Sequence, residues 1–254
     1  MRTDAVYGFN DVFRKDIQAL LDTADAAGIR VEFTLFDFLV AGAPADVDGV
    51  QVRGREEIFT QAAQRADVLE HLLVPFLEEF GDHPALAGFD VLNEPEWLVA
   101  KAEGGAWEDV TDLDSRAENA VPAASIRGFA TECAATVRAH APGKWVTMGV
   151  SAPHVGLAEG LALDYRAVHY YPWMGPIGEV LAGVPDDLPW SLEEFPTNDT
   201  DLGLTDHLDA ARAAGAAGAL AWNLTPEADG ASMPYSERNA ALVSMREWIE
   251  AGVR

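Results

Sequence analysis

Residues 88–95 read GFDVLNEP, and this stretch decides the fold that the rest of the sequence supports. It is a short apolar run that ends in the polar residues Asn93 and Glu94. Residues 190–196, WSLEEFP, have the same form and end in two glutamates. Short apolar runs bounded by polar and turn residues are typical of buried strands. Both stretches therefore predict strands that deliver acidic side chains at their C-terminal ends.

Strand-like and helix-like segments alternate along the whole chain. We expect helices between Asn10 and Gly28 and over 58–80, 125–140, 177–181, 205–214 and 236–251, and strands over 30–38, 88–93, 145–151, 165–171, 190–195 and 218–223. The segments at 39–54 and 94–124 lack such periodicity and are expected as loops. Strands that alternate with helices predict an α/β fold with a parallel sheet.

No Gly-rich phosphate loop follows any predicted strand, which argues against a nucleotide-binding sheet. The alternative is a TIM (β/α)8-type barrel, in which reactive residues gather at the C-terminal ends of the strands. The sequence meets that condition, because the other strand ends carry His169, Tyr171 and Trp222. We therefore expect a single barrel domain over 1–254, with six β/α units. Carboxylates, an imidazole, a phenol and indoles on one rim are the groups that glycoside hydrolysis needs.

Four short motifs on successive strand ends resemble those of the glycoside hydrolase family 5 cellulases and mannanases, in the clan of retaining (β/α)8 glycosidases: Asn93-Glu94-Pro95, His169-x-Tyr171, Glu194-Phe195 and Trp222. The resemblance covers most of the chain, from about residue 5 to 250. It implies hydrolysis of a β-1,4-linked glucan or mannan by a retaining double displacement. It also implies a carbohydrate substrate and no cofactor. The histidines outside these motifs are scattered without the spacing of metal ligands, so we expect no metal site.

The resemblance also implies roles for the acidic residues. Glu94 would be the general acid/base, Asn93 would bind the sugar 2-hydroxyl, and Glu194 would be the nucleophile. Strand alternation sends Glu193 and Glu194 to opposite faces, but twisting at a strand end leaves open which of them faces the sugar. The family pattern favours Glu194.

Aromatic residues on the rim complete the expected site. By the same resemblance, Tyr171 would hold the nucleophile, His169 would line the sugar subsite, and Trp222 would be a stacking platform. Trp97 and Trp173 fall in rim loops, where an indole can either stack on a sugar or pack within its own loop. We include both among the expected substrate-binding residues.

Three other residues are assigned structural roles. Asp90 lies on a predicted strand and is interpreted as a polar group inside the barrel. Asp37 ends the strand at 30–38, where many relatives carry a histidine, and is interpreted as a solvated acid on the rim. Cys133 is the single cysteine; it excludes a disulfide framework and is expected in the core.

Compared with the family's eight strands, the six predicted here correspond to the third to the eighth. The first two strands, and an arginine that bonds the nucleophile in relatives, have no counterpart. This pattern suggests a truncated gene or a misplaced start, and it predicts exposed sheet edges. It also leaves a second interpretation open, a non-catalytic carbohydrate-binding remnant of a barrel.

The net charge limits the kinds of partner that the chain can bind. The 254 residues include 42 acids and 17 bases, for a net charge of -25, which excludes nucleic acid as a partner. Only three bases are lysines, a pattern that a salty cytoplasm and a high-GC genome explain equally well. Neither a signal peptide nor a membrane-spanning stretch is recognisable, so the expected location is cytoplasmic unless the N-terminus is truncated. The sequence does not indicate an oligomeric state.

Overall fold

The computed structural model describes residues 8–42, 44–47, 49–99, 121–197 and 201–223. The chain forms two compact units, of which unit 1 comprises Met1–Gly149 and Gly156–Asp164, and unit 2 the remainder. The helix expected at 236–251 lies outside the described residues, and the single domain over 1–254 stays a prediction. In the described part of the chain, no helix combines the length and the apolar character needed to cross a membrane.

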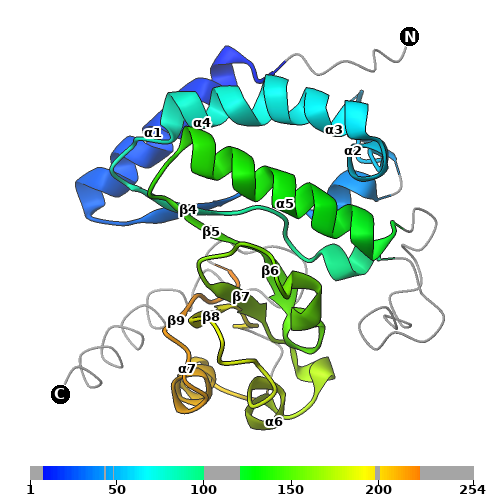
Figure 1. The fold of residues 1–254 in the computed structure, drawn as a ribbon. Helices are drawn as coiled ribbons and strands as arrows, with labels where there is room; N and C mark the ends of the chain where they lie inside the picture. Colours follow the sequence, from blue (N-terminus) through cyan, green and yellow to red (C-terminus); the bar gives the residue numbers. More distant parts are fainter. Residues whose placement is uncertain (1–7, 43, 48, 100–120, 198–200, 224–254) are drawn as a thin grey trace. The chain divides into compact units, whose positions relative to one another are not determined.

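Unit 1 is built on a parallel sheet. Its strands are β1 (Val31–Thr34), β4 (Leu86–Asp90) and β5 (Trp145–Thr147), in the order β1-β4-β5. Figure 1 shows the main helices of unit 1 together on one side of this sheet: α1 (Asp11–Ala27), α4 (Val74–Phe80) and α5 (Ala123–His140). The predicted strands are confirmed, although they are shorter than expected, and the helices predicted between Asn10 and Gly28 and over 125–140 are confirmed as α1 and α5.

Helix α1 begins and ends where its sequence predicts. The Asn10 side chain accepts a hydrogen bond from the backbone N–H of Phe13 at 2.9 Å, which satisfies one of the free donors of the first turn. Gly28 adopts a left-handed conformation with φ of 70° and ends the helix. Both signals act within a few residues, which is why the sequence alone located them.

The helix expected at 58–80 is present, but it is interrupted at Gln61, whose φ of -117° and ψ of 113° are extended, and it contains a π-helical turn. The chain there forms α2 (Glu57–Thr60), α3 (Ala62–Val68), a π-helical turn (Leu69–Leu73) and α4. Pro75 lies in the first turn of α4, has no N–H to donate, and its ring would clash with the carbonyl four residues earlier. The wider π-helical turn immediately before α4 accommodates that missing hydrogen bond.

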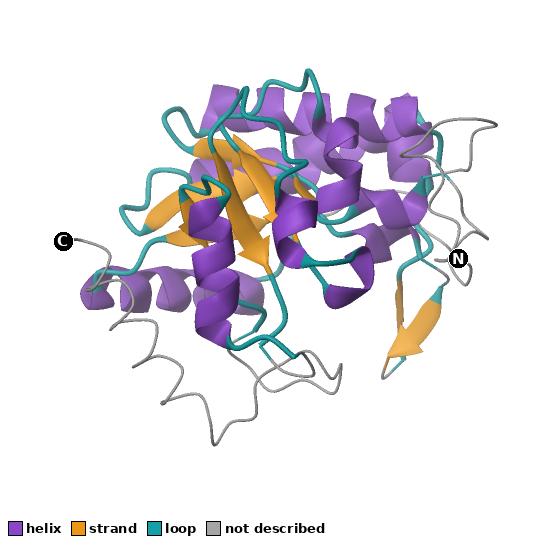
Figure 2. Cartoon of the chain, turned by 90° about the horizontal axis from the view of Figure 1, so that it is seen from below, coloured by secondary structure: helices purple, strands orange, loops and turns teal. Residues whose placement is uncertain are grey.

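The segment at 39–54, expected as a loop, contains structure of its own. A 3-10 helix, η1 (Phe38–Ala41), is followed by an antiparallel hairpin of β2 (Ala45–Val47) and β3 (Val50–Val52), which projects from the body of unit 1 in Figure 2. In the turn, Asp46 accepts a hydrogen bond from the N–H of Gly49 at 2.9 Å, and Gly49 has a φ of 83°. Each strand is three residues long, too short for a periodicity to be recognised.

Unit 2 contains the second parallel sheet. Its strand order is β6-β7-β8-β9, with β6 (Gly149–Ser151), β7 (Arg166–His169), β8 (Trp190–Glu194) and β9 (Gly218–Ala219). The 3-10 helix η5 (Ala152–Ala158) follows β6, and α6 (Ile177–Leu181) and α7 (Leu204–Ala213) follow β7 and β8. The segment predicted as one strand at 145–151 is thus divided, because β5 pairs with β4 while β6 belongs to the sheet of unit 2.

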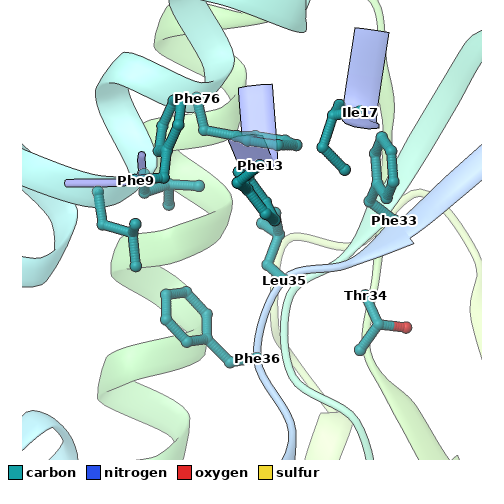
Figure 3. A pocket seen from close by; sticks show the side chains of 10 residues that line it. Phe9, Phe13, Ile17, Phe33, Thr34, Leu35, Phe36 and Phe76 are labelled. Carbon is teal, nitrogen blue, oxygen red and sulfur yellow. The ribbon is translucent and has the colours of Figure 1, made fainter. Parts of the chain in front are cut away.

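The side of unit 1 next to β1 holds an apolar cavity. β1 is an edge strand of its sheet within the described residues, as the six-strand pattern predicts. The cavity beside it has a volume of about 230 Å³, and Thr34 is the one polar residue in its lining. Figure 3 shows the side chains of α1, β1 and α4 that surround it, with the rings of Phe13, Phe33 and Phe76 among them.

Candidate active site

Glu94 follows β4 at its C-terminal end and is held in an unusual backbone conformation. Its φ of 45° and ψ of 47° place it in the left-handed region, which is unfavourable for a side chain with a Cβ. The Glu94 N–H donates to the carbonyl of Gly149 at 2.8 Å, and the 3-10 helix η3 (Pro95–Leu98) follows directly. Such strain, of order 1–3 kcal/mol, persists only where surrounding contacts impose it and is frequent at functional sites.

The Glu94 carboxylate has a neighbour from the next turn. Trp97 donates its indole Nε1–H to Oε2 of Glu94 at 2.8 Å, and the Trp97 ring lies 6.0 Å from the ring of Phe38. The N–H edge of the indole is therefore bound to the Glu94 carboxylate. The sequence predicted Trp97 as a substrate-binding residue and contained no signal for this hydrogen bond.

Asn93 is held by both its backbone and its side chain. Its N–H donates to the carbonyl of Phe36 at 2.8 Å, and its side-chain Nδ2 donates to Oδ2 of Asp37, also at 2.8 Å. Asp37 is half-buried and bonded to Asn93. The interpretation of Asp37 as a solvated acid was wrong, because the end of β4 lies directly beside it.

Asp90 takes the structural role expected of it. It is 5% exposed, and its Oδ1 accepts hydrogen bonds from the N–H of Leu92 and the N–H of Gly149, both at 3.0 Å. Gly149 in turn accepts from Glu94 through its carbonyl. Asp90 thus secures the backbone on which the conformation of Glu94 depends.

In unit 2, Glu194 ends β8 and has two neighbours from β7 and the residues after it. The Tyr171 hydroxyl donates to Oε1 of Glu194, and His169 Nδ1 lies 3.5 Å from Oε2. His169 is 3% exposed. Glu193 faces elsewhere and accepts from the Ser191 hydroxyl at 2.6 Å. Of the two candidate acids, Glu194 is the one beside both predicted partners.

Tyr170, between these two neighbours, faces the helices. Its hydroxyl donates to the carbonyl of Gly175 at 2.9 Å, and its ring lies 5.9 Å from that of His207 in α7. His207 also stacks on Phe195 at 5.1 Å. Burial holds the pKa of His207 below its usual range. These residues form the packed layer beneath the end of β8.

The remaining rim indoles of unit 2 differ in exposure. Trp173, in the 3-10 helix η6 (Pro172–Met174), is 61% exposed. Trp222 follows β9, where its N–H donates to the carbonyl of Phe195 at 3.0 Å and its carbonyl accepts from the Thr197 hydroxyl at 2.8 Å. The backbone of Trp222 is therefore fixed, and the residue is half-buried.

Cys133 lies in α5 and is fully buried. Burial raises the pKa of its thiol well above the usual range, which keeps it protonated and unreactive. Its expected place in the core is confirmed.

Comparison with known proteins indicates the fold. No family model matches the chain, and no curated protein sequence matches it. Among solved structures, the chain is similar to an endo-1,4-β-mannanase from Eisenia fetida, with a TM-score of 0.76 and 20% identity over 97% of this chain and 74% of that one. It is also similar to β-1,4-D-mannanase from Cryptopygus antarcticus, with a TM-score of 0.72 and 18% identity over 96% and 74% of the two chains. A third neighbour is the β-mannanase of Mytilus edulis, with a TM-score of 0.67 and 18% identity over 95% and 74%.

At these identities the comparisons show the fold and no more. The chain has the α/β fold of a TIM-type barrel, and it spans about three quarters of the length of these neighbours. The described residues supply six strand segments of it, with the segment at 145–151 divided into β5 and β6, and helices follow five of these segments. The missing first two strands remain a prediction.

Proposed function

We propose that this chain is a retaining β-glycoside hydrolase that acts on a β-1,4-linked mannan or glucan. The observation that carries the proposal is the environment of Glu194, whose carboxylate accepts from the Tyr171 hydroxyl and faces the buried His169. Hydrogen bonds to an ionised carboxylate are strong and directional, so they fix the orientation from which it would attack a sugar.

The proposed reaction assigns one step to each carboxyl group. Glu194 attacks the anomeric carbon and forms a glycosyl-enzyme ester while Glu94 gives a proton to the leaving oxygen. Glu94 then takes a proton from water, the water attacks the anomeric carbon, and the Glu194 carboxylate is released. The contact of Asn93 with the sugar 2-hydroxyl, which strengthens in the transition state, would lower the barrier of both steps.

The neighbours favour mannan as the first substrate to test. Structures similar in fold include an endo-1,4-β-mannanase, a β-mannanase and a β-1,4-D-mannanase. A neutral polysaccharide is also compatible with a net charge of -25, which would repel an anionic one. Exposed Trp173 offers an apolar ring face of the kind on which sugar rings stack.

The experiment that tests the mechanism follows the anomeric configuration of the product. With an aryl β-glycoside, proton NMR at early times is expected to show the β-anomer first. Glu194→Ala supplied with azide is expected to release the α-glycosyl azide, and Glu94→Ala the β-glycosyl azide, because azide replaces a nucleophile in one case and a base-activated water in the other. Glu193→Ala is the matched control, since that carboxylate is bonded to Ser191.

Three outcomes would contradict the proposal. An α-anomer formed first indicates inversion, and loss of activity in Glu193→Ala with full activity in Glu194→Ala reverses the assignment of the nucleophile. Wild-type protein that binds mannan in a pull-down but releases no sugar indicates the carbohydrate-binding remnant instead.

A further inference from the structure

Asp37 uses both of its carboxylate oxygens, and only one of them serves the local fold. Oδ1 accepts the N–H of Leu39 at 2.7 Å and so caps the 3-10 helix η1. Oδ2 accepts the side-chain N–H of Asn93 at 2.8 Å, from a residue 56 positions further along the chain. The capped helix holds the carboxylate in place, so the second oxygen is a fixed acceptor.

The backbone fixes the same pair of residues. Asp37 and Asn93 form a parallel bridge, in which Phe36 O accepts from Asn93 N–H at 2.8 Å and Phe38 N–H donates to Asn93 O at 3.1 Å. Neither end of the side-chain hydrogen bond can therefore move without breaking main-chain contacts. The distance between the two side chains is set by the fold.

This pairing decides which way the Asn93 amide faces. An ionised carboxylate accepts hydrogen bonds and donates none, so it selects the nitrogen end of the amide. The reverse orientation would set the amide oxygen against a carboxylate oxygen and lose a charge-assisted bond. Asp37 therefore leaves Oδ1 of Asn93 and its second N–H available to a ligand.

We propose that Asp37 is a positioning residue for the glycosidase reaction and acts by orienting the Asn93 amide toward the sugar 2-hydroxyl. This proposal rests on the proposed function, because it needs a substrate that Asn93 contacts. Asp37, which follows β1, would thereby help to stabilise the transition state. Asp37 itself touches no substrate in this arrangement.

The isosteric change Asp37→Asn separates orientation from capping. An asparagine at 37 keeps an oxygen for the N–H of Leu39 but presents an NH2 group to Asn93, which must turn its amide round to accept it. A misoriented polar contact near the reacting centre lowers kcat by about 10- to 100-fold. KM is expected to change little, because the 2-hydroxyl contact strengthens in the transition state.

The matched control is Asp46→Asn in the β2–β3 hairpin. Asp46 also accepts a backbone N–H, that of Gly49 at 2.9 Å, and it is exposed. Its replacement is expected to leave kcat within about twofold of wild type, as for a surface position with no catalytic contact. Melting temperatures of both variants establish that neither effect is due to unfolding.

The decisive measurement is a double-mutant cycle on kcat with Asn93→Ala. If Asp37 acts through Asn93, then adding Asp37→Asn to Asn93→Ala causes no further loss. A 2-deoxy substrate is expected to give equal rates with wild type and Asp37→Asn, because it lacks the hydroxyl that the Asn93 amide would contact. Additive losses in the cycle, or an equal loss on the 2-deoxy substrate, would overturn the proposal.

A second measurement does not depend on turnover. In a 1H–15N spectrum, the side-chain NH2 of Asn93 is expected to exchange slowly and to lose that protection in Asp37→Asn. If wild type is inactive on every β-glycoside while the protection is present, the proposed function fails although the pairing stands. If wild type is active and the NH2 is unprotected, the role of Asp37 fails by itself.

Discussion

Replacing Tyr171 by phenylalanine removes one hydroxyl and keeps the ring. In the structure that hydroxyl donates to Oε1 of Glu194, whose other oxygen lies 3.5 Å from His169 Nδ1. The Glu194 side chain is 12% exposed, so water has little access to replace the missing donor. Tyr171→Phe is therefore expected to remove one of the contacts that orient the proposed nucleophile.

The size of the effect follows from that contact. A hydrogen bond to a charged group contributes about 1.5–3 kcal/mol. Since each 1.36 kcal/mol in a barrier is a factor of ten, kcat/KM should fall by about 10- to 160-fold. The assay is initial-rate kinetics on an aryl β-mannoside, with the melting temperature measured in parallel.

Tyr170→Phe is the matched control, because the two tyrosines are adjacent. The Tyr170 hydroxyl donates to the carbonyl of Gly175 in a packed layer. Removing it is expected to lower stability by about 0.5–1.5 kcal/mol and to leave kcat/KM near that of wild type. A Tyr171→Phe enzyme within twofold of wild type, or equal losses of activity in both variants, would refute the proposed role of Tyr171.

Three further predictions concern binding, packing and pH. Trp173→Ala is expected to raise KM for mannan oligosaccharides by about 2- to 13-fold, since aromatic stacking contributes about 0.5–1.5 kcal/mol. Trp145 is similarly exposed but begins a strand, so Trp145→Ala should leave KM unchanged, and equal effects of the two changes would contradict a sugar-binding role. Phe76→Ala enlarges the cavity beside β1 and is expected to lower the free energy of unfolding in urea by about 3–5 kcal/mol. A loss below about 1 kcal/mol would contradict this, because it would mean that neighbouring side chains move in to fill the space. Burial holds the pKa of His207 below its usual range, so the imidazole of the unfolded chain binds a proton at higher pH than that of the folded chain. The melting temperature should therefore fall as the pH drops below about 6.5. His207→Gln should weaken this pH dependence of the melting temperature, and an unchanged dependence would contradict the role of His207.

The elements that the sequence predicted well are those whose signals are local. The ends of α1 follow from Asn10 and Gly28, which act on neighbouring backbone groups. The order of strands and helices follows from apolar periodicity over single segments. The π-helical turn before α4 was also encoded locally, in Pro75, but the apolar pattern continues across it and gave no sign of the change in helix type.

The candidate site shows the opposite case. Alternation along β8 left both Glu193 and Glu194 as candidates for the nucleophile, because the direction of a side chain at a strand end depends on local twist. Side-chain contacts distinguish them, since Tyr171 and His169 from the β7 segment lie beside Glu194, whereas Glu193 accepts from Ser191 of its own strand. A contact with a residue some 23 positions away leaves no mark on the periodicity of either segment.

By itself, the sequence determined that acids, an imidazole and indoles lie at the C-terminal ends of parallel strands, because the alternation of strand and helix sends the strand ends of each sheet to the same edge of that sheet. Tertiary structure decided how those side chains are held. The left-handed backbone of Glu94 depends on the carbonyl of Gly149, and the amide of Asn93 depends on the carboxylate of Asp37. These hydrogen bonds join segments more than fifty residues apart, and their geometry exists only once the strands are paired.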